Sequence, residues 1–350
     1  MDTQKRILIT GASGSLGQQL IYELTRAGCR PIAHVRESSD TRYIDSLGLE
    51  KRVADLRNKE QLAALVEGID GIIHTAAWID FRRDRLTQFT GINVFGAVEL
   101  FKAAQAAGVE RFLHVSSVAA TAAIPFVNGE KSLLRESPER VTEEHEFNLE
   151  HLRIPYIMTK RAAEVELNKL VGSGKTELVT VNPSIMLAPS PTGDDRARAI
   201  KRFGHFVLPG FQNRVNLVDL RDVAPGVIAA LRFGRAGERY ILAGDNVTAR
   251  ELVLTASAIV RRVPHVMRMP RGVFEIAAKL SLTWGKLTAS SRIGFYPDLV
   301  KLLDYDWAFS SMKARRELGY TNRSIWVTLD DLLNNRFHGT YLKPAAGNKV

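Results

Sequence analysis

The stretch Thr10-Gly11-Ala12-Ser13-Gly14-Ser15-Leu16-Gly17 decides the fold of this chain. It follows the apolar run Ile7-Leu8-Ile9, which predicts a buried strand, and it precedes leucines at helical spacing. Glycines at these positions allow a tight turn, the approach of backbone N–H groups to a pyrophosphate and close helix–sheet packing, and the helix start adds partial positive charge. We therefore predict a dinucleotide-binding loop made by Gly11, Ser13, Gly14, Ser15, Leu16 and Gly17.

Strands and helices alternate through the first half of the chain. Short apolar runs predict strands at Ile32–Val35, Val53-Ala54, Gly71–His74, Phe112–Ser116 and Leu178–Val181. Helical spacing predicts helices around residues 62–66, at Val94–Ala107 and at Tyr156–Val171. Alternation of this kind joins parallel strands through crossover helices, so we expect an α/β fold with a Rossmann-type, doubly wound parallel sheet.

The pattern changes after Pro183, where prolines interrupt the chain. Tyr240–Leu242 predicts one strand in a turn-rich segment, and helical patterns return at Glu251–Arg262 and Pro270–Leu287. We therefore predict a smaller C-terminal substrate-binding domain. The expected boundaries are 1–183 for the cofactor-binding Rossmann domain, with later strand and helix contributions from about 214–243, then 184–213 and 244–340 for the substrate-binding region, and 341–350 for a flexible tail.

Composition excludes several classes of protein. The 350 residues are 45% hydrophobic and 25% charged, which is a globular composition. A single cysteine, Cys29, cannot form an internal disulfide, which favours a reducing compartment, and we expect a cytoplasmic protein. No run approaches about 18 uninterrupted apolar residues, so we expect no transmembrane helix. The first apolar run is too short for a secretory signal.

The chain is basic, with 48 Lys and Arg against 38 Asp and Glu. Most of the excess lies between Arg196 and Arg316. Such a surface is either simply solvated or attracts nucleic acid, a membrane surface or an anionic substrate. Because zinc-ligand spacing and a basic heptad region are both absent from the sequence, we expect no nucleic-acid partner. A small-molecule substrate is the expected partner, and a peripheral membrane contact stays open.

The end of the second predicted strand reads the adenosine ribose in folds of this kind. An acid there accepts from the ribose 2′-hydroxyl and favours NAD(H), and Glu37 lies 20 positions after Gly17. Arg36 comes first, however, and Arg42 supplies a second cation. An arginine binds the 2′-phosphate of NADP(H) in bidentate fashion. We therefore predict NADP(H) as the cofactor, with NAD(H) as the alternative.

Tyr156 and Lys160 open a predicted helix and, four residues apart, share one face of it. A nearby ammonium stabilises a phenolate, so we expect Lys160 to lower the tyrosine pKa toward a useful acid/base range. The spacing alone is also that of an ordinary surface pair. Ser117 strengthens the catalytic interpretation, because it lies at the carboxyl end of a predicted parallel strand, where ligands bind.

With these motifs in order, the chain resembles the extended short-chain dehydrogenases/reductases, which include nucleotide-sugar epimerases, dihydroflavonol reductases and 3β-hydroxysteroid dehydrogenases. The resemblance covers nearly the whole chain, and dimers are common in this family, so a homodimer stays open. It is carried by Thr10–Gly17, Asp55-Leu56, His74–Ala77, Asn93–Gly96, Ser116-Ser117, Tyr156 with Lys160, Asn182–Ser184, Val218–Ala224 and Lys313–Tyr320.

The resemblance implies roles for particular residues. Ser117, Tyr156 and Lys160 would form a catalytic triad, with Lys160 also holding the nicotinamide ribose. Asp219 and Asp222 would hold the substrate domain together, and Asn93 would steady the fold. Further cofactor contacts would come from Asp55 at the adenine amino group, Leu56 beside its ring, Ala76 and Ala77 along the cofactor, and Pro183 and Ser184 beside the nicotinamide.

Departures from family patterns narrow the reaction. Ser117 is followed by Val118-Ala119 rather than by the acid pair of the dehydratases, and Thr121 stands where sugar epimerases carry a tyrosine. Val35–Asp40 is similar to the dihydroflavonol reductase branch. We therefore expect an NADP(H)-dependent oxidoreductase that interconverts a ketone or aldehyde and an alcohol. A nucleotide-sugar epimerase and a non-catalytic NADP-sensing regulator are the alternatives.

Two apolar segments, Phe203–Phe211 and Ala119–Phe126, suggest a hydrophobic substrate such as a sterol, a flavonoid-like ring, a polyketide or an acyl chain. Ordinary core packing explains them equally well. The helix Pro270–Leu287 packs in a core, covers a substrate or lies on a membrane. A diphosphate or carboxylate on the substrate would instead be met by Arg196, Arg198, Lys201, Arg202, Arg214 and Arg221.

Overall fold

The computed structural model describes residues 5–79, 86–125, 139–187, 207–209, 213–261, 267–269, 276 and 297–334. Several expectations concern other parts of the chain and so lie outside the described residues. They are the basic residues Arg196, Arg198, Lys201 and Arg202, the apolar side chains between Phe203 and Phe211, Phe126, the helix Pro270–Leu287 apart from Ile276, and the tail 341–350.

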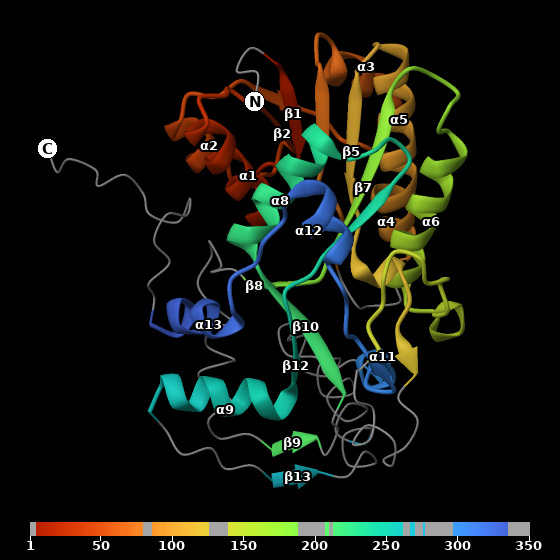
Figure 1. The fold of residues 1–350 in the computed structure, drawn as a ribbon. Helices are drawn as coiled ribbons and strands as arrows, with labels where there is room; N and C mark the ends of the chain where they lie inside the picture. Colours follow the sequence, from red (N-terminus) through yellow and green to blue (C-terminus); the bar gives the residue numbers. More distant parts are fainter. Residues whose placement is uncertain are drawn as a thin grey trace, which may run out of the picture.

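A seven-stranded parallel sheet forms the upper half of the molecule in Figure 1. Its order is β11-β7-β5-β4-β1-β2-β3, so the chain moves outward from β1 in one direction and then returns to build the other side. This confirms the predicted doubly wound, Rossmann-type sheet. The strands are β1 (Ile7–Thr10), β2 (Ile32–Val35), β3 (Lys51–Val53), β4 (Gly71–His74), β5 (Arg111–Val115), β7 (Glu177–Pro183) and β11 (Arg239–Leu242).

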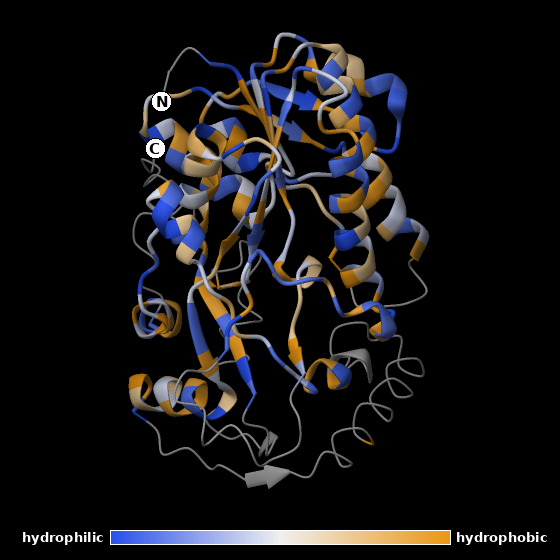
Figure 2. Cartoon of the chain, turned by 45° about the vertical axis from the view of Figure 1, so that its right-hand side comes forward, coloured by the Kyte–Doolittle hydropathy of each residue, from blue (hydrophilic) through white to orange (hydrophobic). Residues whose placement is uncertain are grey.

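Helices cover both faces of this sheet. Successive strand residues point to opposite faces, so Ile7 and Ile9 pack into one core and Leu8 into the other. Figure 2 shows the hydrophobic residues gathered on the strands and on the helix surfaces beside them. One face carries α1 (Ser15–Arg26), α8 (Leu220–Phe233) and α12 (Met312–Leu318), and the other carries α3 (Lys59–Val66), α5 (Ala97–Ala106) and α6 (Pro155–Lys169).

A smaller group of elements lies at the lower end of the view in Figure 1. There the three-stranded sheet β12-β10-β8 packs with α9 and α13 around Leu217, Leu329 and Leu332. Among the described residues, no helix has both the length and the apolar composition that crossing a membrane requires. The bounds are β8 (Ile185–Leu187), β10 (Arg214–Asp219), β12 (Asp245–Thr248), α9 (Ala249–Ile259) and α13 (Ile325–Leu333).

The remaining described elements are short. Two strand pairs, β6 with β14 and β9 with β13, lie outside the two larger sheets. Their bounds, and those of the short helices, are β6 (Ile124–Pro125), β14 (Tyr305–Asp306), β9 (Val207–Pro209), β13 (Met267–Met269), α2 (Arg42–Ser46), α4 (Leu86–Phe89), η3 (Val118–Ala120), η4 (Glu150–Leu152) and α11 (Pro297–Leu302).

The predicted helix Val94–Ala107 is wrong at its start. Thr90–Gly96 form a π-helix, η2, and the α-helix α5 follows from Ala97. Apolar spacing could not reveal this, because the wider turn is fixed by a tertiary contact. The Asn93 side chain accepts from the backbone N–H of Trp78 at 2.7 Å and donates to its carbonyl at 3.1 Å. These bonds tie η2 to the loop after β4, so Asn93 steadies the fold as expected.

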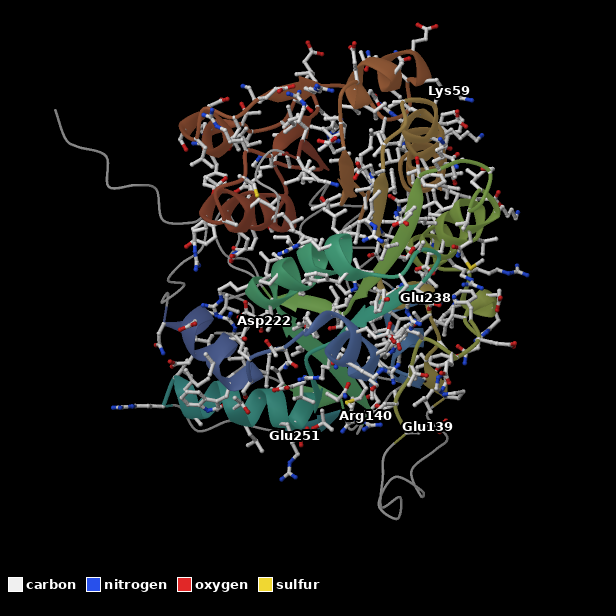
Figure 3. The ribbon with its side chains drawn as sticks, turned by 45° about the horizontal axis from the view of Figure 1, so that its top comes forward. Lys59, Glu139, Arg140, Asp222, Glu238 and Glu251 are labelled. Atoms are coloured by element: carbon white, nitrogen blue, oxygen red, sulfur yellow. The ribbon has the colours of Figure 1, made fainter. Side chains whose placement is uncertain are left out.

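Two buried carboxylates join the smaller group of elements to the large sheet. Asp219 caps α8, accepts from the Arg221 side chain at 2.7 Å and accepts from the Thr328 hydroxyl of α13 at 2.8 Å. Asp222, labelled in Figure 3, accepts from the backbone and side chain of Arg323 at 2.7 and 2.8 Å. These contacts confirm that both residues are network and capping carboxylates.

Asp219→Ala should reduce the free energy of unfolding by about 3–5 kcal/mol, because it leaves the buried Arg221 guanidinium with an incomplete set of partners. Chemical denaturation of the purified protein measures this. Asp45→Ala, which removes an exposed ion pair with Lys51, is the control and should cost less than about 1 kcal/mol. Equal losses in the two variants would contradict the assignment of a buried structural network to Asp219.

Candidate active site

The predicted loop joins β1 to α1 as a close-packed turn. Gly11 has a φ of 68°, and a Cβ there would lie 2.9 Å from Thr75 Oγ1 and 3.0 Å from the Ala76 Cα. A Cβ on Gly17 would overlap the Gly11 carbonyl oxygen and lie 2.7 Å from the Ala12 Cα. Neither position has room for a side chain. The glycines therefore hold the start of α1 directly against the carboxyl ends of β1 and β4.

The start of α1 fits the phosphates of a dinucleotide. Gly14 is the N-cap, and no side chain caps the helix. Its own N–H bonds to the Gly11 carbonyl at 3.0 Å, which closes the turn. Leu16 is buried, whereas Ser13 and Ser15 are partly exposed beside the helix start. Uncapped N–H groups together with the positive end of the helix dipole form an anion-binding surface.

The two arginines predicted to read a 2′-phosphate differ in their surroundings. Arg36 is exposed directly after β2, and its backbone N–H donates to the Ser39 hydroxyl at 3.0 Å. Arg42 forms an ion pair with Asp40, its Nε donating to both carboxylate oxygens at 2.9 and 3.1 Å. Arg36 is therefore the better-placed arginine, since Arg42 already has an acidic partner.

Asp55 and Leu56 lie in the loop after β3, next to η2. Leu56 is 5% exposed, and its Cβ would lie 3.2 Å from a Cβ on Gly96. The Asp55 carboxylate accepts from Arg57 Nε at 2.9 Å, and this contact lowers the pKa of Asp55 to about 2. Asp55 is therefore ionised and can accept from an amino group. Arg57, an exposed cation at this place, was not singled out from the sequence.

The loop after β4 carries the predicted contacts Ala76 and Ala77. Both are partly exposed, and Ala76 N–H donates to the Thr10 hydroxyl at 3.3 Å, which binds this loop to β1. Trp78 follows, and its buried indole nitrogen has no partner among the described residues. An unpaired buried donor of this kind is uncommon and marks a place where a ligand group can accept a hydrogen bond. The sequence reasoning did not select Trp78.

Ser117 and Tyr156 meet beyond the carboxyl end of β5. Ser117 caps the short helix η3, its hydroxyl accepting from the Ala119 N–H at 3.2 Å. Tyr156 is the second residue of α6, and its phenol lies near enough to the Ser117 side chain for that side chain to oppose the rise in the pKa of Tyr156. Pro155 occupies the first helical position, where the fixed φ of proline suits a helix start. The structure thus brings these two residues together, as predicted.

Lys160 lies one turn further along α6 and is 4% exposed. Its ammonium donates to the Val115 carbonyl at 3.0 Å. Burial lowers the pKa of Lys160 to about 8, and the Glu164 carboxylate opposes that change. The expectation that Lys160 lowers the tyrosine pKa is wrong for this arrangement. Burial raises the pKa of Tyr156 and the Ser117 side chain opposes this rise, while the Lys160 ammonium is bonded to the Val115 carbonyl.

Pro183 and Ser184 end β7 and begin the chain toward β8. Ser184 is 6% exposed, and its hydroxyl is a buried group without a partner among the described residues. The preceding residue, Asn182, donates from one amide nitrogen to the Ser117 carbonyl at 2.9 Å and to Glu164 Oε1 at 2.6 Å. Asn182 therefore links β7, α6 and the segment that holds Ser117.

A row of polar side chains crosses the sheet on the α6 face. Thr10, His74 and His114 are register partners on β1, β4 and β5, and His74 Nδ1 lies 2.8 Å from the Thr10 hydroxyl. Burial lowers the pKa of His74 to about 3 and that of His114 well below its usual value, and the Lys160 charge lowers both further. Both imidazoles are therefore neutral at physiological pH.

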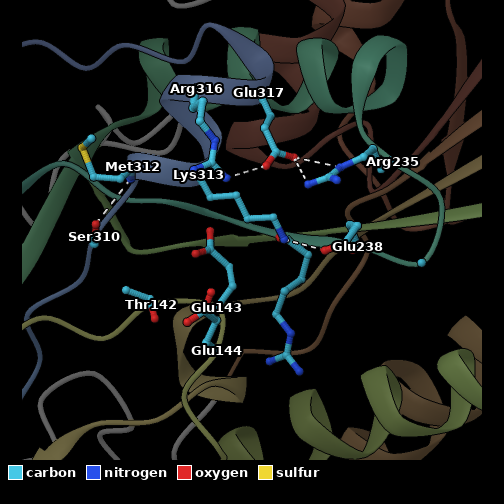
Figure 4. A pocket seen from close by; sticks show the side chains of 12 residues that line it. Thr142, Glu143, Glu144, Arg235, Glu238, Ser310, Met312, Lys313, Arg316 and Glu317 are labelled. Carbon is cyan, nitrogen blue, oxygen red and sulfur yellow. Dashed lines mark hydrogen bonds and ion pairs between the residues drawn. The ribbon is translucent and has the colours of Figure 1, made fainter.

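A surface cavity of about 460 Å³ lies apart from Tyr156, beside β11 and α12. Figure 4 shows Lys313 crossing it to Glu238, at 2.6 Å, and Arg235 paired with Glu317, at 2.7 Å. These two ion pairs are of the kind found on a solvated surface. Arg239 also lines this cavity, and its Nη1 lies 3.7 Å from Glu164 Oε2.

The predicted site residues gather at one edge of the sheet. The glycine loop, Ala76, Ser117 and Ser184 follow β1, β4, β5 and β7, whose carboxyl ends lie together at the point where the strand order reverses. Arg36 follows the next strand, β2. Glu164 was missed, although its position four residues after Lys160 places both on one helix face.

Comparison with known proteins agrees with this architecture. The model of the NAD dependent epimerase/dehydratase family matches residues 7–243. A putative dihydroflavonol 4-reductase of Synechocystis sp. is 29% identical over 341 residues, 93% of each chain. Sterol demethylase protein B of Methylococcus capsulatus is 26% identical over 336 residues, 93% of this chain and 96% of that protein. The crystal structure of gox2253 is 26% identical, with a TM-score of 0.76 over 96% of this chain and all of that one.

The matched residues include the glycine loop, the Ser117–Tyr156–Lys160 group and the last strand of the large sheet. The family match therefore covers more than half of the chain and contains the site built above. The chain belongs to the NAD dependent epimerase/dehydratase family and is an extended short-chain dehydrogenase/reductase.

Proposed function

We propose that the chain is an NADP(H)-dependent oxidoreductase that interconverts a ketone or aldehyde and an alcohol, with Tyr156 as its acid/base. The placement of Tyr156 near the Ser117 side chain, one helical turn from buried Lys160, carries this proposal. It stands beside a glycine loop that has the shape and the free N–H groups for a dinucleotide. When bound, the nicotinamide supplies or accepts a hydride.

Ser117 and Tyr156 have different proposed roles at the substrate oxygen. The Ser117 hydroxyl orients the carbonyl oxygen, and Tyr156 donates its phenolic proton as negative charge develops on that oxygen. Because burial raises the pKa of Tyr156, the phenol stays protonated at neutral pH. A protonated tyrosine is the form that reduction needs, so this arrangement favours the reductive direction near neutrality. Alcohol oxidation needs the phenolate and is therefore favoured at higher pH.

Lys160 contributes a buried positive charge close to the reacting groups. We propose that it binds the nicotinamide ribose, as the family resemblance implies. Its pKa of about 8 keeps most of it charged at neutral pH. Alkaline conditions remove this charge and with it the contribution of Lys160 to cofactor binding.

The NADP(H) preference rests on Arg36. This exposed guanidinium follows β2 directly, at the place where folds of this kind read the adenosine ribose. Arg57 is a third cation near this region, paired with Asp55. A doubly charged 2′-phosphate gains from charge-assisted hydrogen bonds that a ribose hydroxyl cannot form to the same extent.

The proposed substrate is hydrophobic. Ala122 and Ala123, from the apolar segment after Ser117, pack in cores with Phe309 and Ile154, so the support for this proposal comes from the relatives. The relatives named for dihydroflavonol reduction and sterol demethylation point toward a ring-containing apolar substrate. We also propose a cytoplasmic location, on the single buried, unpaired Cys29.

Epimerisation of a nucleotide sugar is less well supported. The residue at the place of the epimerase tyrosine, Thr121, is 1% exposed, and its hydroxyl donates to the Val118 carbonyl at 2.7 Å. The Thr121 hydroxyl is thus already bonded within the local turn, and a threonine has no phenol to replace that of the epimerase tyrosine. A cofactor-sensing regulator is expected to lack the catalytic tyrosine or lysine. This chain keeps both Tyr156 and Lys160, which argues against that alternative.

Tyr156→Phe should lower the rate of NADPH-dependent carbonyl reduction by about 10²–10⁴-fold, the usual contribution of a positioned acid. NADPH affinity should change by less than about threefold, since the variant keeps the ring. NADPH oxidation over a panel of apolar ketones and aldehydes measures the first quantity, and fluorescence titration measures the second. Unchanged turnover would remove Tyr156 from the mechanism. Turnover of UDP- or GDP-sugars with no carbonyl reduction would favour the epimerase.

Arg36→Ala should weaken NADPH binding by about 10–100-fold, the loss of charged hydrogen bonds to one phosphate, and should leave NADH binding nearly unchanged. Arg30→Ala is the matched control, because Arg30 is an exposed arginine before the opposite end of β2. Dissociation constants for both cofactors with both variants test the assignment. Equal wild-type affinity for NADH and NADPH, untouched by Arg36→Ala, would show that Arg36 does not read the cofactor.

A further inference from the structure

A buried acid, Glu164, stands one helical turn behind Lys160 and is 1% exposed. It lies on α6, four residues after Lys160, so the two side chains share a face of the helix. Exposed acids on the same helix, such as Glu166, pair with lysines at the surface. A carboxylate is rarely buried this completely without a specific reason, because removing its charge from water is costly.

The partners of Glu164 connect it to the segment that carries Ser117 and to β11. Asn182 donates to Glu164 Oε1 at 2.6 Å and, through the same amide nitrogen, to the Ser117 carbonyl at 2.9 Å. Glu164 therefore orients the amide that holds the segment bearing Ser117. From the other side, Arg239 of β11 lies 3.7 Å from Glu164 Oε2.

The charges around this pair decide the ionisation of Lys160. Burial lowers the pKa of Lys160 to about 8, and the Glu164 carboxylate raises it. The two imidazoles on the neighbouring strands, His74 and His114, are neutral and compensate no charge. Burial raises the pKa of Glu164 overall, and the hydrogen bond from Asn182 together with the Arg239 guanidinium 3.7 Å away opposes this and favours the charged form.

We propose that Glu164 is a positioning residue of the active site, which places a balancing carboxylate one helical turn behind Lys160 and, through Asn182, fixes the segment that carries Ser117. The proposal rests on the proposed function, because it assigns Glu164 a role behind Lys160 and Ser117. Glu164 touches neither group that would react. It acts through its charge on one side and through its hydrogen bond to Asn182 on the other.

The substitution Glu164→Gln separates these two actions. A glutamine has nearly the same shape and keeps an oxygen that accepts from Asn182, but it carries no charge. Lys160 then loses the carboxylate that raises its pKa, so it gives up its proton at a lower pH. NADPH affinity depends on the lysine charge and should therefore begin to fall at a lower pH than in the wild-type protein.

The experiment measures NADPH dissociation constants by fluorescence from about pH 6 to pH 10, on either side of the lysine transition. In wild-type protein the affinity should fall around pH 8. In Glu164→Gln the midpoint should move down by about one pH unit. Glu166→Gln, two residues away on the exposed surface of α6, is the matched control and should leave the midpoint unchanged. Glu164→Asp, which keeps the charge, should restore the midpoint at least in part.

An unchanged midpoint in a folded Glu164→Gln variant would overturn the proposal. A Lys160 titration in the cofactor-free protein, followed by NMR of ¹³C-labelled lysines and assigned through Lys160→Met, keeps the test independent of the reaction. If wild-type protein neither binds NADPH nor reduces carbonyls, the proposed function fails, yet this titration still reports whether Glu164 sets the charge of Lys160. A normal lysine midpoint together with full reductase activity would reject only the role of Glu164.

Discussion

Close packing between the first helix and the first strand is the constraint on which the rest of the structure depends. At Gly17 the helix backbone approaches the Gly11 carbonyl so closely that a Cβ would overlap it. This contact holds the start of α1 at the carboxyl ends of β1 and β4, where the strand order reverses. Helix, loop and strand ends therefore form one edge, and the proposed site residues Ala76, Ser117 and Ser184, which follow β4, β5 and β7, lie along it.

Buried charge is the second feature that organises this edge. The Lys160 side chain is buried near two neutral histidines, His74 and His114. The Glu164 carboxylate, on the same helix, partly compensates the lysine charge. Asn182 connects that acid to the segment of Ser117, so the electrostatics of the lysine and the geometry of the serine are linked. Farther away, two more buried carboxylates join the smaller group of elements to the large sheet: Asp219 accepts from Thr328, and Asp222 accepts from Arg323. In this molecule, buried polar contacts thus fix the relative positions of elements that pack together through their apolar faces.

Much of the large sheet was predictable from the sequence, since a strand buried on both faces reads as a continuous apolar run. Gly71–His74 matches β4 residue for residue, and the other runs mark their strands within two residues. Strand β12 could not be predicted, because Asp245 and Asn246 give it no apolar pattern. It forms a strand by pairing with β10. The π-helix at Thr90–Gly96 gives no such apolar pattern either, since Asn93 is held by its bonds to the backbone of Trp78, in the loop after β4.

The sequence by itself determined the fold class, the glycine turn and the set of Ser117, Tyr156 and Lys160, because each depends on local spacing or on residue type. Only the tertiary structure decided how these groups behave. The ammonium of Lys160 donates to the Val115 carbonyl, and burial raises the pKa of Tyr156. Glu164 is buried one helical turn beyond Lys160. These outcomes follow from desolvation and from contacts between β5, α6 and β7, and both arise only when segments far apart in the chain pack against one another.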